Sequence, residues 1–161
     1  YSLEDKQPDQ LLAEWLIANK RTFGTAESCT GGEIAAKLVK HSGISAVYKG
    51  SIVAYMPEVK VMLLGVEPTV IEGNGIVSEE VAKAMAIGAR RVLGTDFALS
   101  ITGIAEAAKD APAEEQPQAW IGFAGPDGVY ALHIRLMKDR RVNIEIAAYA
   151  ALVFALKSIR S

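Results

Sequence analysis

Hydrophobic positions in this chain fall into two patterns that predict helices and strands. Apolar residues at three- and four-residue spacing predict helices over Pro8–Lys20 at the beginning and Asp139–Ile159 at the end. Further helices are expected where start and stop residues flank such a pattern, over Glu33–Lys40, Pro57–Leu64 and Ser78–Leu93. Short apolar or β-branched runs predict strands over Thr22–Ala26, Tyr48–Tyr55, Asp96–Ile101, Ala119–Ala124 and Val129–Met137.

The order of these elements indicates the fold class. Interleaved helices and buried strands are typical of an α/β domain with a mixed sheet. Pro126-Asp127-Gly128 is a turn signal, so the last two strands are expected to pair as a hairpin. The segment Glu106–Gln118 lies between two strands and is expected to be a loop within the domain. The whole chain, residues 1–161, is therefore interpreted as a single domain.

Composition narrows the range of functions. Half of the 161 residues are hydrophobic and the net charge is −2, which does not favour binding to nucleic acid or to an anionic membrane. The polar segment Tyr1–Gln10 does not resemble a signal peptide, and the longest apolar run, Ile146–Leu156, is too short to span a bilayer. A cytoplasmic location is expected. The same run exceeds what one buried helix face needs, so a homo-oligomer is possible.

The first candidate site is the segment Ala26–Gly32, which follows a predicted strand and begins a helix. Loops at the carboxyl ends of strands commonly carry ligand sites. Gly31 and Gly32 would let backbone N–H groups approach a ligand, and a helix N-terminus favours an anion. Ser28 would be a nucleophile if a base activates it. The structural alternative is that Thr30 caps the helix in a capping box and the glycines only make the turn.

Three further segments carry candidate side chains. Lys60, one turn into a predicted helix, can serve as a general base for a serine if its pKa is lowered, and Tyr55 ends the strand before that helix. Thr102 and Gly103 end another strand, and Arg140 precedes the last helix, where it could clamp a phosphate or carboxylate. Each also has a structural alternative, as a solvated surface residue or as part of a turn.

Cys29 is the one cysteine of the chain, which excludes an intramolecular disulfide and a zinc cluster of thiolates. A thiolate at a helix N-terminus would have a lowered pKa. A catalytic Cys–His pair needs a histidine, however, and nothing in the sequence brings His41 or His133 to this position. We therefore interpret Cys29 as a small packing residue.

Four motifs, in this order, resemble those of one family. They are Ala26-Glu27-Ser28-Cys29-Thr30-Gly31-Gly32, Tyr55–Lys60 followed by Leu64-Gly65-Val66, Gly75-Ile76-Val77-Ser78-Glu79-Glu80, and Thr102-Gly103-Ile104-Ala105. Together they are similar to the C-terminal domain of CinA (competence/damage-inducible protein A), whose stand-alone form is nicotinamide-nucleotide amidase. The resemblance runs from about Leu11 to Leu156.

This resemblance implies a three-layer α/β/α domain that deamidates nicotinamide mononucleotide to nicotinate mononucleotide and ammonia. It implies a Ser–Lys mechanism with no metal and no cofactor, and a small-molecule nucleotide as the substrate. The catalytic residues it implies are Ser28, Lys60 and Tyr55. The residues expected to bind the substrate are Thr30, Gly31, Gly32, Thr102, Gly103 and Arg140.

The chain departs from the family pattern in three places. Glu106–Asp110 stands where the family usually has Gly-Pro and further glycines, and Glu106 adds a negative charge where a substrate phosphate is expected. Gln116–Trp120 replaces Lys-Pro-Val-Gly-Thr, and Ile144 stands where a second arginine is expected. Two hypotheses follow: an active amidase, or a catalytically impaired paralogue that binds a different small molecule or acts through a partner.

Overall fold

A five-stranded mixed sheet forms the centre of the molecule. The computed structural model describes residues 6–160, so half of the polar segment 1–10 and the last residue lie outside the described residues. The strands lie in the order β2-β1-β3-β4-β5; β1 is parallel to β2 and β3, while β4 is antiparallel to β3 and β5. The bounds are β1 Phe23–Glu27, β2 Tyr48–Val53, β3 Phe97–Ile104, β4 Gln118–Gly125 and β5 Gly128–Arg135.

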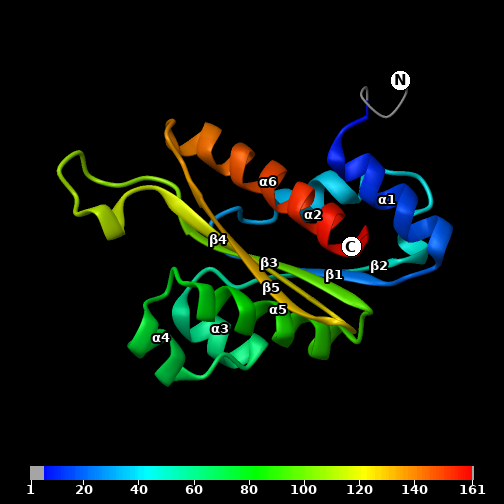
Figure 1. Cartoon of the computed structure of the whole chain (residues 1–161), viewed down its shortest axis with the longest axis horizontal. Helices are drawn as coiled ribbons and strands as arrows, with labels where there is room; N and C mark the ends of the chain where they lie inside the picture. The colour runs from blue at the N-terminus through cyan, green and yellow to red at the C-terminus, as the bar shows by residue number, and fades with distance from the viewer. Residues whose placement is uncertain (1–5, 161) are drawn as a thin grey trace.

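Helices cover both faces of this sheet, which confirms the three-layer α/β/α fold class (Figure 1). One face carries α1 (Pro8–Asn19), α2 (Glu33–Leu38) and α6 (Arg140–Arg160). The other carries α3 (Pro57–Leu64), α4 (Pro68–Asn74) and α5 (Glu79–Leu93). Short 3-10 turns occur at Ile44–Ala46 and Ala113–Glu115.

Alternation along the central strand divides the core between the two layers. Leu99 and Ile101 of β3 pack with α1, α2 and α6, whereas Ala98 packs with α3 and α5. The side toward α5 uses small residues, and a Cβ at Gly122 of β4 would collide with the carbonyl of Ala82 of α5. The helical layers therefore approach the sheet closely enough to bury the strand ends from which the candidate site is built.

Most predicted elements appear within a few residues of their expected bounds. Ser78 caps α5 as expected, because its Oγ accepts a hydrogen bond from the N–H of Val81 at 3.2 Å. The expected hairpin of β4 and β5 is confirmed. The seven-residue helix α4 was not predicted, since its sequence lacks a periodic apolar face and no residue of it is buried. β3 also continues to Ile104, beyond the predicted end at Ile101.

The final helix differs from its sequence-based interpretation. The uninterrupted apolar run is short, yet α6 as a whole is long and apolar enough, by length and composition, to cross a membrane. In this structure α6 packs against α1, α2 and the sheet. Its buried side chains are Asn143, Ala147, Ala148, Ala151, Leu152, Ala155, Leu156 and Ile159. Val142, Ile146 and Tyr149 are exposed along its outer side, and the homo-oligomer stays a prediction.

Candidate functional site

A pocket of about 290 Å³ lies at the carboxyl ends of β1 and β3. It is lined by six of the residues singled out from the sequence: Ser28, Tyr55, Lys60, Thr102, Gly103 and Arg140. The parallel pairing of β1 with both neighbours explains this convergence, because it brings the carboxyl ends of three strands to one edge of the sheet. The N–H of Ala54 donates to the carbonyl of Glu27 at 2.8 Å, which joins the ends of β1 and β2.

Ser28 and Lys60 are in hydrogen-bonding contact at the floor of this pocket. Lys60 Nζ lies 2.9 Å from Ser28 Oγ, and the lysine side chain is completely buried. The same nitrogen donates to the carbonyl oxygens of Ala54 at 2.7 Å and Tyr55 at 3.2 Å. A neutral amine has two N–H groups and one lone pair. If the two carbonyls take both N–H groups, the lone pair is left to face the serine hydroxyl.

Burial changes the proton affinity of this lysine. Because desolvation disfavours the ammonium form, the pKa of Lys60 falls from 10.5 to about 8. Within residues 6–160, Nζ hydrogen-bonds to one hydroxyl and two carbonyl oxygens and to no carboxylate, so no anionic hydrogen-bond partner restores the usual pKa. Lys60 is thus held next to a serine with a pKa suited to accepting a proton near neutral pH.

The pKa of Cys29, the residue after Ser28, shifts in the opposite direction to that of Lys60. Cys29 is buried, and burial raises the pKa of its thiol to about 12. The thiol therefore stays protonated at neutral pH, in agreement with its interpretation as a packing residue. A Cβ on Gly103 would lie 2.9 Å from the Sγ of Cys29. The absence of a side chain at Gly103 therefore lets Cys29 pack closely against β3.

Glu27 organises the turn that presents Ser28. Its side chain is completely buried at the end of β1. Its carboxylate accepts hydrogen bonds from Thr30 Oγ1 at 2.6 Å and from the N–H groups of Ile34 and Ala35 at 3.0 and 2.9 Å. The N–H of Gly32 also donates to it, at 3.2 Å. An acidic side chain from the preceding strand therefore occupies the N-terminus of α2.

This arrangement corrects the expected capping box of Thr30, while substrate binding by Thr30, Gly31 and Gly32 stays a prediction. The N-cap position of α2 is Gly32, and the Thr30 hydroxyl is bound to Glu27, so the expected capping box does not form. The N–H of Gly31 donates to the carbonyl of Ser28 at 3.0 Å and that of Gly32 to Glu27, so both are engaged within the turn. With φ of +60° and +106°, both glycines take left-handed conformations that shape the turn. None of the three lines the pocket.

The rim of the pocket is formed by Tyr55, Arg140 and Glu106. The Tyr55 side chain is 54% exposed, and its hydroxyl accepts from Arg140 Nη2 at 3.0 Å. Arg140 Nη1 lies 3.7 Å from Glu106 Oε1, with both side chains about half exposed or more. The hydroxyl of Tyr55 therefore contacts the rim arginine, while its carbonyl oxygen contacts Lys60. The structure places Glu106 on the arginine that was expected to meet a phosphate.

Thr102 of β3 and Trp120 of β4 differ in their position relative to the pocket. Thr102 lines the pocket, but its hydroxyl donates to the carbonyl of Ile76 at 2.9 Å and the residue is almost fully buried. Trp120, which departs from the family pattern, does not line this pocket, and its ring lies 4.8 Å from that of His133, centroid to centroid. Thr102 thus ties the wall together, and the tryptophan contributes to the pairing of β4 with β5.

Asn143, in the first turn of α6, is a site residue that the sequence analysis missed. Its completely buried side chain donates to the carbonyls of Ala105 at 2.9 Å and Lys138 at 2.8 Å, and accepts from the N–H of Lys138 at 2.9 Å. It therefore fixes the segment after β3 to the segment before α6. Glu106 lies in the first of these segments, and Arg140, the first residue of α6, directly follows the second. The only sequence feature that could have indicated this role is the position of a polar amide, Asn143, near the start of an otherwise apolar helix.

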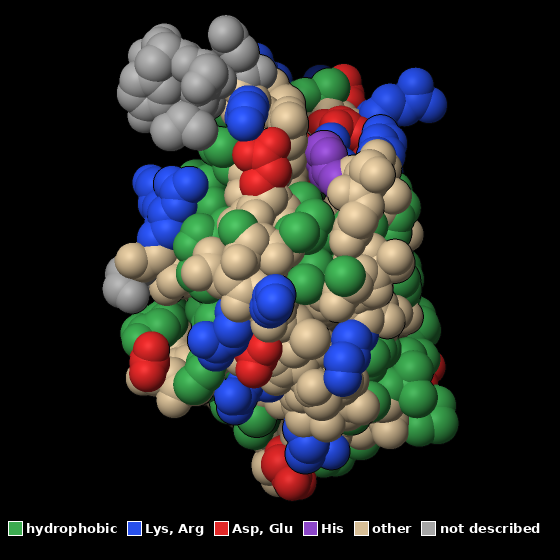
Figure 2. Space-filling model, turned by 90° about the vertical axis from the view of Figure 1, so that its right-hand side faces the viewer, with side chains coloured by type: hydrophobic (Ala, Val, Ile, Leu, Met, Phe, Trp, Pro, Cys, Tyr) green, Lys and Arg blue, Asp and Glu red, His purple; other side chains and the backbone are tan. Residues whose placement is uncertain are grey.

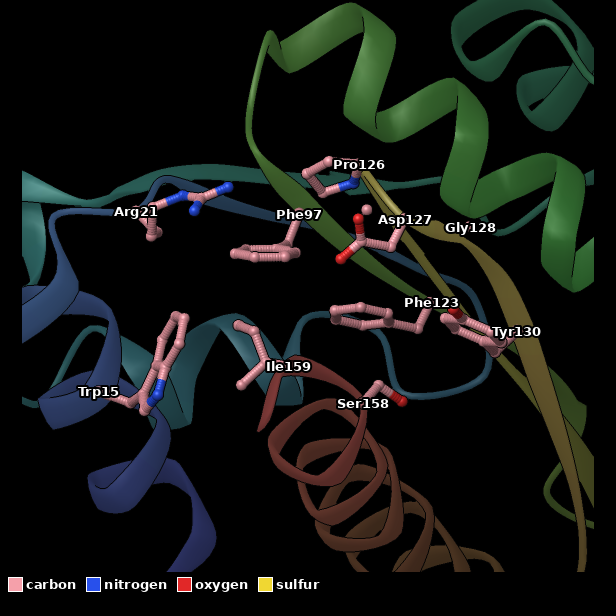
Figure 3. Close-up of a pocket in the computed structure, with 11 residues that line it drawn as sticks. Trp15, Arg21, Phe97, Phe123, Pro126, Asp127, Gly128, Tyr130, Ser158 and Ile159 are labelled. Atoms are coloured by element: carbon pink, nitrogen blue, oxygen red, sulfur yellow. The ribbon is translucent and has the colours of Figure 1, made fainter. Parts of the chain in front are cut away.

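A larger cavity, of about 430 Å³, lies at the opposite end of the sheet. Its wall includes Trp15, Phe97, Phe123 and Tyr130 (Figure 3). Its Arg21 is already engaged, with Nε 3.3 Å from Asp96 and its guanidinium over the Phe97 ring. Figure 2 shows this end of the molecule, where Lys and Arg side chains lie dispersed among acidic and apolar ones. The walls of this cavity are therefore largely aromatic.

The part of the chain that the structure describes has no obvious set of metal ligands. Over residues 6–160, no three His, Cys, Asp or Glu side chains are grouped so that they could hold a metal ion.

Comparison with known proteins shows the family to which the chain belongs. The family model of the CinA C-terminal domain matches residues 5–159, nearly the full length. The chain belongs to the CinA C-terminal domain family. The family resemblance expected from the four sequence motifs is thereby confirmed.

Individual relatives are similar over most of this chain. A CinA-like protein of Fervidobacterium nodosum is 37% identical over 142 residues, covering 88% of this chain and 35% of the relative. A CinA-like protein of Mycolicibacterium paratuberculosis is 45% identical over 134 residues, covering 81% and 30%. The chain thus spans about a third of the length of these curated relatives.

Solved structures include chains of similar size. The competence/damage inducible protein CihA from Agrobacterium tumefaciens is 29% identical, with a TM-score of 0.85, and the match covers 97% of this chain and 98% of that one. A CinA superfamily protein from Escherichia coli is 27% identical, with a TM-score of 0.84, over 91% of this chain and 85% of that one. The CinA fold is therefore shown.

Proposed function

We propose that this CinA-family domain is an amidohydrolase in which Ser28 is the nucleophile and Lys60 the general base. The observation that carries the proposal is the 2.9 Å contact between Lys60 Nζ and Ser28 Oγ in a buried floor. A serine is a weak nucleophile until a neighbouring base accepts its proton. Lys60, with its pKa lowered to about 8, provides such a base.

The first half of the proposed reaction forms an acyl-enzyme. Ser28 Oγ attacks the carbonyl carbon of a carboxamide while its proton passes to Lys60 Nζ. The carbon–nitrogen bond then breaks, and Lys60 returns this proton to the departing nitrogen, which leaves as ammonia. The two carbonyls that hold Nζ, those of Ala54 and Tyr55, keep the amine directed at the serine in both steps.

The second half releases the acid. A water molecule attacks the ester carbon, and Lys60 accepts its proton. The bond to Ser28 Oγ breaks, the proton passes from Lys60 to the serine, and the carboxylic acid leaves and gives its remaining proton to the solvent. The resting state is restored without any group outside this pair of side chains.

Nicotinamide mononucleotide is the substrate that we propose for this site. The family resemblance of the Ser28 and Lys60 motifs supports it. The pocket of about 290 Å³ also combines a buried nucleophile with an arginine at its rim, which suits a carboxamide that carries a distant anionic group. The product would be nicotinate mononucleotide.

The test is ammonia release from nicotinamide mononucleotide by the purified protein and by Ser28→Ala. We expect the wild type to release ammonia and Ser28→Ala to lose about three orders of magnitude or more in rate, since the covalent route is removed. Ser100→Ala is the matched control, because Ser100 Oγ is buried and bound to the carbonyl of Ala82, away from the pocket.

Two results would contradict the proposal. One is a folded wild-type protein that releases no ammonia, which would favour the impaired paralogue. The other is a Ser28→Ala variant with wild-type rates, which would remove Ser28 as the nucleophile. Circular dichroism of each variant separates loss of chemistry from loss of fold.

A further inference from the structure

The larger cavity, at the end of the sheet away from Ser28, has the size of a small-molecule site. Its volume of about 430 Å³ exceeds the 290 Å³ of the proposed catalytic pocket and lies within the usual range of about 300–1,000 Å³. The two share no lining residue: β3 begins at the larger cavity with Phe97 and reaches the catalytic pocket with Thr102. The proposed function therefore gives the larger cavity no role.

Aromatic rings form the inner wall of this cavity (Figure 3). The rings of Phe97 and Phe123 have centroids 5.7 Å apart and an interplanar angle of 26°. The ring of Trp15 meets Phe97 at a steeper angle of 68°, with centroids 6.1 Å apart. Both phenylalanines are almost fully buried, whereas Tyr130 at the outer side is 45% exposed. The wall therefore offers a planar apolar ligand both stacked and edge-on ring contacts.

Asp127 supplies a carboxylate at the edge of this aromatic wall. It lies in the turn between β4 and β5, and its exposed side chain lines the cavity. The turn packs tightly on the wall, since a Cβ at Gly125 would lie 2.9 Å from Cδ1 of Phe97. Within residues 6–160, no cationic side chain lies within salt-bridge distance of the Asp127 carboxylate. This carboxylate is therefore available to a cationic group of a ligand.

Arg21 supplies a positive charge at the other side of the Phe97 ring (Figure 3). Its guanidinium carbon lies 5.0 Å from the centroid of that ring, and its Nε lies 3.3 Å from Asp96 Oδ2. Asp96 does not line the cavity, and its carboxylate also accepts from the N–H of Thr22 at 2.8 Å. The ion pair and the ring contact thus hold the guanidinium at the cavity wall.

We propose that this cavity binds a free aromatic α-amino acid. The ring of the ligand packs against Phe97 and Phe123, its carboxylate meets Arg21, and its ammonium group meets Asp127. An anionic ligand without a cationic group would face the Asp127 carboxylate, and a cationic ligand without an anionic group would face Arg21. A free amino acid carries both charges on one carbon atom, whereas a residue inside a peptide has lost both to amide bonds.

The fluorescence of Trp15 reports binding at this cavity. The chain has two tryptophans, and Trp120 lies outside the cavity, beside His133. In a Trp120→Phe protein, the indole emission therefore comes from Trp15. Titration with L-phenylalanine, which does not absorb where indole is excited, should change this emission saturably with a Kd of about 1 mM or less. Isothermal titration calorimetry of the unaltered protein should give the same Kd.

Two analogues of L-phenylalanine assign each charge of the ligand to its partner. 2-Phenylethylamine lacks the carboxylate, and 3-phenylpropionate lacks the ammonium group. Asp127→Asn should weaken the binding of the amino acid and the amine about fivefold without weakening that of the acid. Arg21→Gln should weaken the binding of the amino acid and the acid about fivefold without weakening that of the amine.

Matched control variants remove the same charges elsewhere. Asp110→Asn alters an exposed carboxylate in the loop after β3, and Arg135→Gln alters an exposed arginine at the far end of β5. Neither residue lines the cavity, so neither substitution should change the Kd of any of the three ligands. Circular dichroism would confirm that all four variants are folded.

Three results would overturn this inference. One is the absence of both an emission change and binding heat at about 20 mM L-phenylalanine. Another is an amine or an acid that binds more tightly than the amino acid, which would show that the cavity takes a single charge. The third is amino-acid binding that is unchanged in both Asp127→Asn and Arg21→Gln. Ammonia release by Ser28 is measured separately, so failure of either proposal leaves the other in place.

Discussion

The floor of the site (Ser28, Lys60 and the supporting Glu27) and its rim (Tyr55, Arg140 and Glu106) are built in different ways. In the floor, Lys60 and Glu27 are completely buried, Ser28 is nearly so, and each polar side chain has hydrogen bonds of about 3 Å or less. In the rim, the side chains are about half exposed, and the ion pair between Arg140 and Glu106 is 3.7 Å long.

The difference follows from what each region does in the proposed reaction. Moving a proton between an oxygen and a nitrogen needs a fixed geometry and a shifted pKa, and burial gives both. Recognising a charged group needs side chains that reach into solvent and rearrange around it, and there water and salt screen the interactions. Substitutions should therefore have large effects in the floor and small, charge-dependent effects at the rim.

Glu27→Ala should have the largest effect on stability. It would leave the Thr30 hydroxyl and three N–H groups at the start of α2 without their acceptor in a buried turn. Lost hydrogen bonds of this kind give an expected loss of about 3–5 kcal/mol in the free energy of unfolding. Urea denaturation followed by circular dichroism would measure it.

Glu114→Ala is the matched control for this substitution, since Glu114 is exposed in the loop before β4. It should change the unfolding free energy by less than about 0.5 kcal/mol. If Glu27→Ala were no more destabilising than Glu114→Ala, the floor would not depend on the buried carboxylate, and the contrast between floor and rim would be lost.

Tyr55→Phe should have the smallest effect. It removes one hydroxyl that accepts from Arg140 at 3.0 Å on an exposed rim, while the backbone carbonyl that holds Lys60 remains. We expect kcat of ammonia release to stay within about threefold of wild type and KM to rise by about twofold, in line with a single exposed hydrogen bond. Steady-state kinetics would separate the two. A hundredfold loss in kcat would show that the tyrosine hydroxyl takes part in the chemistry, as the family resemblance implies.

The fold and two residues of the floor, Ser28 and Lys60, could be predicted because each leaves a local pattern in the sequence. Strand and helix periodicity indicated the alternating elements, and the parallel arrangement brings strand ends to one edge. Ser28 stands in a distinctive glycine-containing turn, and Lys60 stands at the start of a helix that Pro57 marks clearly. Both residues were singled out from these local signals.

The supporting contacts could not be predicted, since they join residues distant in sequence or compete with a local pattern. Thr30 fitted a capping box, but the nearby buried carboxylate of Glu27 is a stronger acceptor and takes its hydroxyl. Asn143 lies 38 positions from Ala105, and only the tertiary structure reveals that its amide joins the two rim segments. Glu106 was recognised as a charge near the site, but its pairing with Arg140 required coordinates.

The central claim is that a neutral Lys60 takes the proton of Ser28, and the pH dependence of kcat for ammonia release tests it most directly. With a pKa of about 8, Lys60 is about one-tenth neutral at pH 7 and mostly neutral at pH 9. Lys60→Met is the companion variant. At pH 7 Lys60 of the wild type is mostly charged, and its lowered pKa means that burying this charge destabilises the folded state. Lys60→Met removes the charge, so the variant should be at least as stable as the wild type at pH 7.

We predict that kcat rises about tenfold between pH 7 and pH 9 and levels off above an apparent pKa near 8. Folded Lys60→Met should show no measurable ammonia release at any pH. A profile that is flat from pH 6 to pH 10, or activity that survives in Lys60→Met, would contradict the claim that Lys60 is the base.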